Sequence, residues 1–340
     1  MGHRLRWLLL PLLLGAAFGA AEDRFAVLEF FGRPAGAYCS AAGPAMKALQ
    51  EEMQGRAVLL EYDYDAFLHG RQDRFWATGA SATYLPLVMV GSGYRTSSGS
   101  VYYEPVYRSM INAELARPVR AAVSAFWQRT SNTMRTYVEV LNLGATDLEI
   151  DQEASIWLIA YENASIGVST TWVRSTAQQH LPYDLAPGES ATAIIDSWPM
   201  TGVNWSRMAG LVVIEDRPGG YGSYDMLQAT EALPACLTAT PDHLLLSSTG
   251  SSGAEVVLTG PHVLSWSAIS NVPWIEVTPS SGGLPAAATL TMRTELRPPL
   301  ETEGVVTFSA TGDGMDLSAT VSVRVGARNR RGARRVLPER

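Results

Sequence analysis

The residues with the clearest potential for chemistry are Cys39 and the turn before it. In EFFGRPAGAYCSAAGPAMKAL, residues 29–49, an apolar strand leads into a turn of small residues, a cysteine and a helix start. Dithiol turns of this kind carry two cysteines separated by two residues: the first attacks a substrate disulfide and the second resolves the mixed disulfide. Counting back from Cys39 by that spacing gives Gly36, which has no sulfur. The sequence therefore predicts that this turn performs no dithiol exchange.

Cys39 alone is a weak candidate for one-thiol catalysis. A thiol with the ordinary pKa of about 8.5 is only roughly 3% thiolate at pH 7, and burial one turn into a helix lowers that fraction. Arg33, nearby in sequence, opposes this effect only if its guanidinium points toward the sulfur. We expect an inert buried thiol; the alternative is a reactive Cys39.

The chain has only two cysteines, Cys39 and Cys236. This excludes a disulfide-rich scaffold and a four-cysteine zinc site. A disulfide between the two cysteines and two separate buried thiols are both compatible with the sequence.

Residues 1–21 predict a signal peptide. The basic residues His3, Arg4 and Arg6 precede the apolar run WLLLPLLLGAAFGA and small residues suited to cleavage. The run is shorter than the about 20 residues that a spanning helix needs. We therefore expect an exported protein, periplasmic, cell-surface or extracellular, with no transmembrane segment after signal cleavage.

Length and composition indicate a folded protein of two or three domains. The chain has 340 residues, of which 46% are hydrophobic and 17% charged, enough to bury a sizeable core. Its formal net charge of −7 argues against nucleic acid as a partner, because phosphate binding needs a basic surface.

Residues 22–117 alternate strand and helix around Cys39. FAVLEFF, RAVLLEYDYD and LVMV predict strands. Helices are expected after Cys39, across residues 66–78 and within Glu104–Ala116, where Pro118 stops the last one.

This order of elements resembles the thioredoxin fold. The resemblance rests on Glu29–Phe31, on Tyr38–Cys39, on Pro44 within the first helix and on Pro86 before its strand. It implies an α/β domain in which Pro86 is a cis-proline facing the cysteine turn. Gly36 then occupies the degenerate position of the redox turn.

Residues 118–235 predict an immunoglobulin-like (Ig-like) β-sandwich. TMRTYVEVLNLG, EASIWLIAYEN and MAGLVVIEDRPGG are alternating or apolar runs divided by turn residues. With the phrase VVIEDRPGGYGSYDMLQAT, this segment resembles part of a group of exported bacterial envelope proteins.

Residues 236–326 predict about seven further short strands. The phrases LSWSA and PWIEVTPSSGG resemble the BACON domain, an Ig-like module, and the resemblance implies binding of carbohydrate or mucin. Trp266 and Trp274 are the candidates for stacking on a sugar, although Trp on such strands also serves as core. Residues 327–340 form an arginine-rich tail, either disordered or an anchor to an anionic surface.

No metal or cofactor is expected. Asp63, Asp65 and His69 are close in sequence, but a helix N-cap at Asp65 explains the pattern without a metal, and no further ligand is apparent.

The sequence thus predicts a multidomain protein, an α/β thioredoxin-like domain followed by two all-β Ig-like sandwich domains. The predicted function is non-catalytic binding or scaffolding in the cell envelope, with envelope proteins or extracellular glycans as partners and no catalytic residue assigned. Two alternatives stay open: a single-cysteine thiol-disulfide oxidoreductase that uses Cys39, and carbohydrate or mucin binding through the C-terminal module.

Overall fold

A computed structural model describes residues 23–325 except 34–35, 66–69, 248–252 and 297–302. The predicted signal peptide, the arginine-rich tail and His69 lie outside the described residues. The described chain divides into two compact units, one ending at Ala235 (unit 1) and one beginning at Cys236 (unit 2). Strands account for 51% and helices for 16% of the structure, and no described helix is long and apolar enough to cross a bilayer.

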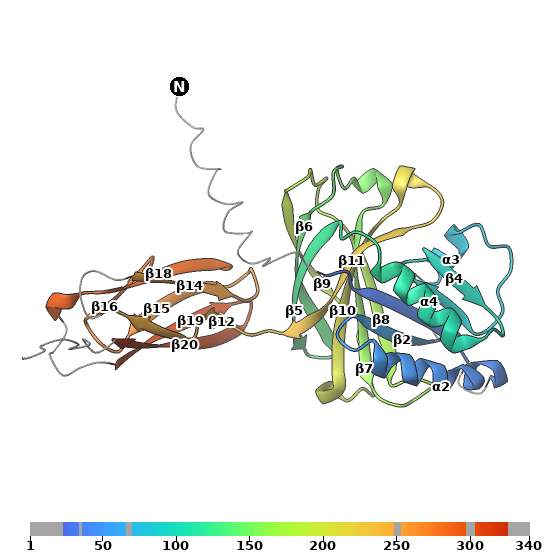
Figure 1. Ribbon diagram of the computed structural model, residues 1–340, viewed down its shortest axis with the longest axis horizontal. Helices are drawn as coiled ribbons and strands as arrows, with labels where there is room; N and C mark the ends of the chain where they lie inside the picture. The colour runs from blue at the N-terminus through green and yellow to red at the C-terminus, as the bar shows by residue number, and fades with distance from the viewer. Residues whose placement is uncertain (1–22, 34–35, 66–69, 248–252, 297–302, 326–340) are drawn as a thin grey trace, which may run out of the picture. The chain divides into compact units, whose positions relative to one another are not determined.

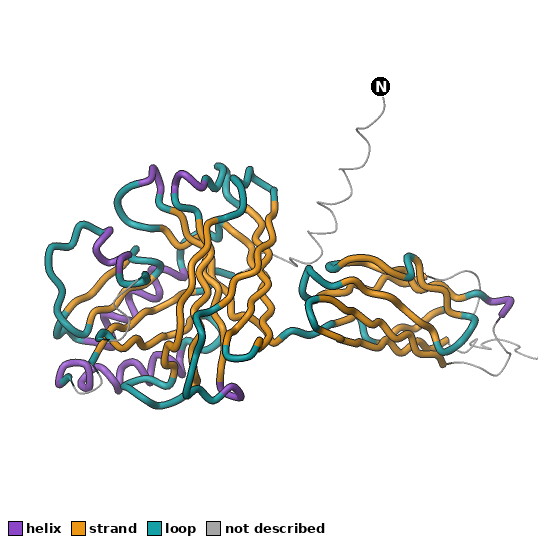
Figure 2. Tube along the Cα trace, turned by 180° about the vertical axis from the view of Figure 1, so that it is seen from behind, coloured by secondary structure: helices purple, strands orange, loops and turns teal. Residues whose placement is uncertain are grey.

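The described part of unit 1 contains one large sheet and three α-helices, and the helices lie together at one end of the unit (Figures 1 and 2). The helices are α2 (Ala37–Glu52), α3 (Asp73–Ala77) and α4 (Tyr103–Leu115). The strands are β1 (Ala26–Gly32), β2 (Ala57–Asp63), β3 (Leu87–Val90), β4 (Arg95–Ser98), β5 (Ala121–Thr130), β6 (Thr133–Asn142), β7 (Ser155–Asn163), β8 (Thr171–His180), β9 (Ser190–Asp196), β10 (Met208–Asp216) and β11 (Asp225–Pro234).

The sheet of unit 1 is mixed and has eleven strands in the order β4-β3-β1-β2-β8-β7-β10-β11-β5-β6-β9. Strands β1 and β2 are parallel, β3 runs antiparallel to β1, and β4 forms a hairpin with β3. Strand β2 then pairs in parallel with β8, which joins the N-terminal strands to the rest of the sheet. Strands β4 and β9 are the two edges.

The sheet folds over itself, so the central strands are buried on both faces. In β10, Leu211 and Val213 belong to a core shared with β1, β2 and β3, whereas Val212 and Ile214 belong to a second core shared with β5, β6 and β9. All four side chains are fully buried. This two-sided burial explains why β10 reads as a continuous apolar run instead of an alternating one.

The prediction of a separate α/β thioredoxin-like domain is wrong. Helices α2 and α4 cover one face of β1–β3, but strands β7, β10 and β11 cover the other. The described part of the segment 66–78, expected to be a covering helix, forms only the five-residue α3. Because the apolar second face of β1 needs cover that α3 is too short to give, the sheet supplies it. The strands expected as an independent sandwich therefore belong to the same unit as β1–β4.

Unit 2 consists of two sheets that face each other (Figure 1). One sheet has the order β12-β14-β18-β16 and the other β13-β20-β19-β15-β17. The strands are β12 (Thr238–Thr240), β13 (His243–Leu246), β14 (Gly253–Thr259), β15 (Ser265–Ser270), β16 (Ile275–Thr278), β17 (Ser281–Gly283), β18 (Ala286–Met292), β19 (Glu303–Gly312) and β20 (Met315–Val325). Trp266 packs against Phe308 with ring centroids 5.8 Å apart, a contact between neighbouring strands of one sheet.

Candidate functional site

Cys39 lies in the first turn of α2, beneath the turn that leads into the helix. Its side chain is only 2% exposed. Gly36 packs on the sulfur, because a Cβ added at this glycine would lie 3.3 Å from Cys39 Sγ. The Gly36 N–H donates to the Arg33 carbonyl at 2.9 Å. The glycine that stands in place of a first cysteine thus lets the turn close over the remaining thiol.

The surroundings of Cys39 disfavour its thiolate. Burial raises the pKa of the Cys39 thiol; a backbone hydrogen bond from Arg33 opposes this rise, and the charge of Glu61 adds to it. The Arg33 guanidinium is engaged elsewhere, since it donates three hydrogen bonds of 2.9–3.1 Å to the Asp65 carboxylate at the surface. The nucleophilic form of the thiol therefore gains no strong support from its neighbours.

Neither cysteine forms a disulfide. Cys39 and Cys236 are both free, and Cys236 belongs to unit 2. Burial also raises the pKa of the Cys236 thiol. Pro86 follows a cis peptide bond directly before β3.

The two tryptophans considered for sugar stacking belong to the interior of unit 2. Trp266 is 2% exposed and Trp274 is fully buried. The Trp266 indole N–H donates to the Gly283 carbonyl at 3.2 Å. Neither ring presents a face to a ligand.

The acidic residues at the end of β2 and just after it close a turn. The Asp63 carboxylate accepts the Asp65 N–H at 3.0 Å, and Asp65 is the partner of Arg33. Within the described ranges no group of three or more His, Cys, Asp and Glu side chains could hold a metal ion.

Unit 1 encloses a cluster of four charged side chains, Glu29, Arg71, Arg74 and Glu215, here called the buried ion cluster. Arg71 donates two hydrogen bonds to Glu29, at 2.8 and 2.6 Å, and one to Glu215 at 2.7 Å. Arg74 donates to Glu215 at 2.8 Å. Glu29 and Glu215 are fully buried, and the arginines are 1% and 4% exposed. Two carboxylates and two guanidiniums make the cluster formally neutral, as buried charges require.

Aromatic side chains complete the hydrogen bonds of the buried ion cluster. The Tyr62 hydroxyl donates to Glu29 at 2.7 Å, and the Trp157 indole N–H donates to Glu215 at 2.8 Å. The Arg74 guanidinium lies 4.5 Å from the centre of a Trp157 ring. Although burial alone raises the pKa of the Glu215 carboxyl, Arg71 and Arg74 outweigh it and hold the pKa below its usual value. The carboxylates are therefore saturated with donors and closed to solvent, which suits a structural role and not acid–base catalysis.

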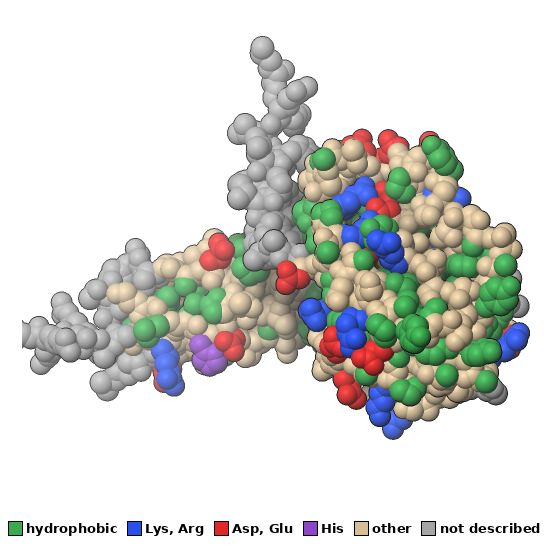
Figure 3. Space-filling model, turned by 45° about the vertical axis from the view of Figure 1, so that its right-hand side comes forward, with side chains coloured by type: hydrophobic (Ala, Val, Ile, Leu, Met, Phe, Trp, Pro, Cys, Tyr) green, Lys and Arg blue, Asp and Glu red, His purple; other side chains and the backbone are tan. Residues whose placement is uncertain are grey.

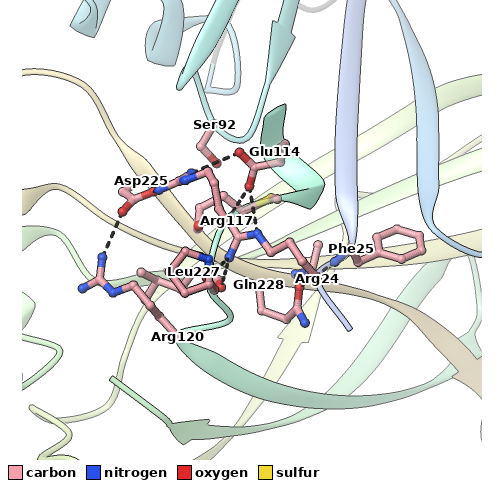
Figure 4. A network of polar contacts seen from close by, with 12 residues as sticks. Arg24, Phe25, Ser92, Glu114, Arg117, Arg120, Asp225, Leu227 and Gln228 are labelled. Atoms are coloured by element: carbon pink, nitrogen blue, oxygen red, sulfur yellow. Dashed lines mark hydrogen bonds and ion pairs between the residues drawn. The ribbon is translucent and has the colours of Figure 1, made fainter. Parts of the chain in front are cut away.

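A second network ties α4, β11 and the residues before β1 together (Figure 4). Arg24 and Arg117 both donate to the fully buried Glu114, in each case at 3.0 Å. Arg117 also pairs with Asp225, which accepts a further hydrogen bond from Arg120 at 2.9 Å. Arg24 additionally donates to the carbonyls of Met226 and Leu227 on β11. Like the buried ion cluster, this network fixes segments that are far apart in the sequence.

Neither network was predicted from the sequence. The signal for the buried ion cluster was an acidic residue inside each of two apolar runs: Glu29 in FAVLEFF and Glu215 in GLVVIED. A carboxylate in a strand buried on both faces must have a partner. The sequence indicates that need, but it does not say which of the chain's many arginines meets it.

Comparisons with known proteins do not place the chain in a family. No protein-family model matches it, and no curated protein sequence matches it, so the resemblances to thioredoxin-like proteins, exported envelope proteins and BACON modules are not supported. A crystal structure of a protein from Agrobacterium tumefaciens was determined by a structural genomics consortium. The match covers 63% of this chain and 96% of that protein's chain, with 15% identity and a TM-score of 0.40. A xyloglucanase of family GH5 from Bacteroides ovatus covers 27% of this chain and 19% of its own with 15% identity and a TM-score of 0.21. An Ig tandem of titin covers 61% and 96% with 9% identity and a TM-score of 0.20. These similarities are too low to define a relationship.

Proposed function

We propose that the protein is an exported, non-catalytic binding protein of the cell envelope or the extracellular space. The observation that carries the proposal is the state of Cys39, a single thiol that is 2% exposed and has a raised pKa. Cleavage of a disulfide by one thiol leaves a mixed disulfide that needs a second thiol for release. Within the described part of unit 1, Cys39 has no such partner. Export rests on the signal-peptide pattern of residues 1–21.

The charged residues of unit 1 also support binding over catalysis. The buried carboxylates Glu29, Glu114 and Glu215 are each bonded to arginine. On the face shown in Figure 3, acidic and basic side chains are interspersed and no single sign dominates. Such a surface is suited to contacts with proteins or peptides more than to a polyanion, which favours a broad basic face.

Thiol labelling of the purified protein tests the proposal. In a Cys236→Ser variant, which leaves Cys39 as the only thiol, native labelling by a disulfide reagent should be at least about a hundredfold slower than labelling in urea. An opening free energy of about 3 kcal/mol is enough for that factor. The same variant should not accelerate the reduction of insulin, with a Cys-X-X-Cys reductase as positive control.

The opposite result would favour a catalyst. Fast native labelling of Cys39, together with insulin reduction that disappears in Cys39→Ser, would overturn the proposal. The Cys39→Ser variant alone should keep the fold, because serine is nearly isosteric with cysteine and the cost of a buried hydroxyl is modest.

A further inference from the structure

Unit 1 has a groove between the edge strand β4 and α4, here called the β4–α4 groove. Its hollow measures about 630 Å³. The residues that matter for the argument are Arg95 and Ser97 on β4, Tyr102 at the start of α4, and Val106, Met110 and Ala113 on α4.

The register of the hairpin places two β4 side chains toward the helix. Arg95 and Ser97 lie opposite Val90 and Val88 of β3, and residues directly opposite in a ladder share a face of the sheet. Val88 and Val90 pack in the core that α2 and α4 cover. Arg95 and Ser97 therefore face the α4 side, where they line the groove together with residues of α4.

The backbone of β4 is free to accept another strand. Strand β4 is the first in the sheet order, and β3 is its only partner among the strands that the structure describes. The Gly99 N–H donates to the Pro86 carbonyl at 3.0 Å. Since hydrogen-bonded and non-hydrogen-bonded pairs alternate in an antiparallel ladder, the N–H and C=O of Thr96 point to the open edge. An open edge next to a groove for side chains is the arrangement by which an extended peptide adds a strand to a sheet.

The helix flank supplies the apolar part of the groove. Val106, Met110 and Ala113 follow one another at spacings of four and three residues, so they line one stripe of α4. Tyr102, at the mouth, is 86% exposed. This stripe can receive alternate apolar side chains of an extended segment.

Arg95 determines the charge of the occupant. Among the described residues it is the one charged side chain that lines the groove, and no described carboxylate pairs with it. Its guanidinium lies 5.0 Å from the Tyr94 ring centre. In contrast, Arg108 on α4 is paired with Glu52 and Glu104. An occupant with a carboxylate satisfies Arg95, whereas the arginine-rich residues 326–340 of this chain carry the wrong charge.

We propose that the β4–α4 groove binds an extended peptide segment of a partner protein, which adds a strand along β4, inserts apolar side chains beside α4 and pairs a carboxylate with Arg95. This inference rests on the proposed binding function and names its partner class. The partner is recognised by backbone pairing and one charge, so its sequence tolerates variation at the positions that point away from the groove.

Selection of peptides on the full chain tests the inference. A random dodecapeptide library with free carboxyl ends is panned on the immobilised protein, and the enriched peptide is synthesised with a fluorescent label as the probe. Enriched sequences should alternate apolar residues and carry Asp, Glu or the terminal carboxylate. Arg95→Gln should weaken binding of the probe about tenfold or more, because a hydrogen bond to a charged group contributes at least that factor.

Two further variants read the backbone and the groove separately. Thr96→Pro removes an outward N–H and no hydrogen bond to β3, and it should abolish binding of the probe. Ala113→Trp should do so by filling the hollow. Arg129→Gln is the matched control. Arg129 is exposed, and its guanidinium lies 4.7 Å from the Trp205 ring centre, a contact similar to the one between Arg95 and Tyr94. It should leave binding unchanged.

Several results would overturn the inference. One is the absence of any enriched peptide, and another is peptide binding that neither Arg95→Gln nor Thr96→Pro weakens. A third is a protein that binds no peptide but forms a dimer, which Thr96→Pro converts to a monomer; this result would assign the edge to a second copy of the chain. Binding that appears only after removal of residues 326–340 would assign the groove to the chain's own tail. None of these outcomes depends on the thiol-labelling result. The experiments therefore distinguish a wrong assignment of the groove from a wrong proposed function.

Discussion

Replacement of Glu29 by glutamine tests the buried ion cluster most directly. The substitution keeps the size of the side chain but removes the negative charge that pairs with Arg71. The cluster, which is neutral in the native protein, is left with one uncompensated positive charge. Removal of one partner of a buried ion pair costs about 3–5 kcal/mol. The amide oxygen of the introduced glutamine still accepts a hydrogen bond, whereas its NH₂ group meets the guanidinium N–H groups. We therefore expect a loss of about 3 kcal/mol in the free energy of unfolding, the lower end of that range.

A double-mutant cycle separates the charge effect from lost packing. Arg71→Met together with Glu29→Gln leaves Glu215 and Arg74 as a neutral pair, joined at 2.8 Å. The double variant should lose less stability than the sum of the two single variants, with a coupling of about 2 kcal/mol. Equal and additive losses would mean that the two side chains do not interact.

Urea unfolding followed by hydrogen exchange is the suitable assay, because peptides from each unit can be read separately in the full chain. With a slope of about 2–3 kcal/mol per molar urea, Glu29→Gln should lower the midpoint of unit 1 by roughly 1 M. Peptides of unit 2 are the internal reference. Asp65→Asn is the matched control, since it breaks a bidentate pair with Arg33 that is exposed to solvent and contributes little. If Glu29→Gln shifts unit 1 no further than Asp65→Asn does, the argument from burial is refuted.

Two further predictions concern packing and pH. Gly91→Ala should destabilise unit 1 far more than Gly79→Ala, as measured by urea midpoints. Both glycines have positive φ, but a Cβ at Gly91 would lie 2.3 Å from Glu114 Oε2, whereas no atom lies within 4 Å of a Cβ at Gly79. Similar shifts would contradict the close packing. Burial raises the pKa of the Asp216 carboxyl to about 6, above its value of about 3.9 in an unfolded chain. Its contribution to stability is therefore present below about pH 4 and is lost as pH rises through about 6. Asp216→Asn should remove that loss from the pH profile of the unfolding free energy, and an unchanged profile would disprove the shift.

Local elements were predictable from the sequence, because their signals are local. The run FAVLEFF gives β1, and the helix expected within Glu104–Ala116 spans Tyr103–Leu115 as α4. The pairing of these elements was not predictable in the same way. An apolar strand shows that both of its faces are covered, but not whether helices or other strands cover them. In β1, helices cover one face and strands cover the other.

The site was predictable only where one residue decides the chemistry. Gly36 in place of a cysteine excludes dithiol exchange on the sequence alone, because a missing sulfur needs no geometry to interpret. The partners of Glu29 and Glu215 depend on contacts 42 to 144 residues away along the chain, and no periodicity encodes such distances. The β4–α4 groove depends on where the sheet ends, which is a property of the whole strand order.

The bonds from Arg24 to β11 have a consequence for biosynthesis. Arg24 and the Leu227 carbonyl that it binds are separated by 203 residues. At a translation rate of about 5–20 residues per second, the beginning of the chain waits roughly 10–40 s for its partner to be made. During that interval β1 and β2 lack the strands β7, β10 and β11 that cover one of their apolar faces. This face thus has no native cover until the last strands of unit 1 are made, and chaperones that recognise exposed apolar segments have time to bind it.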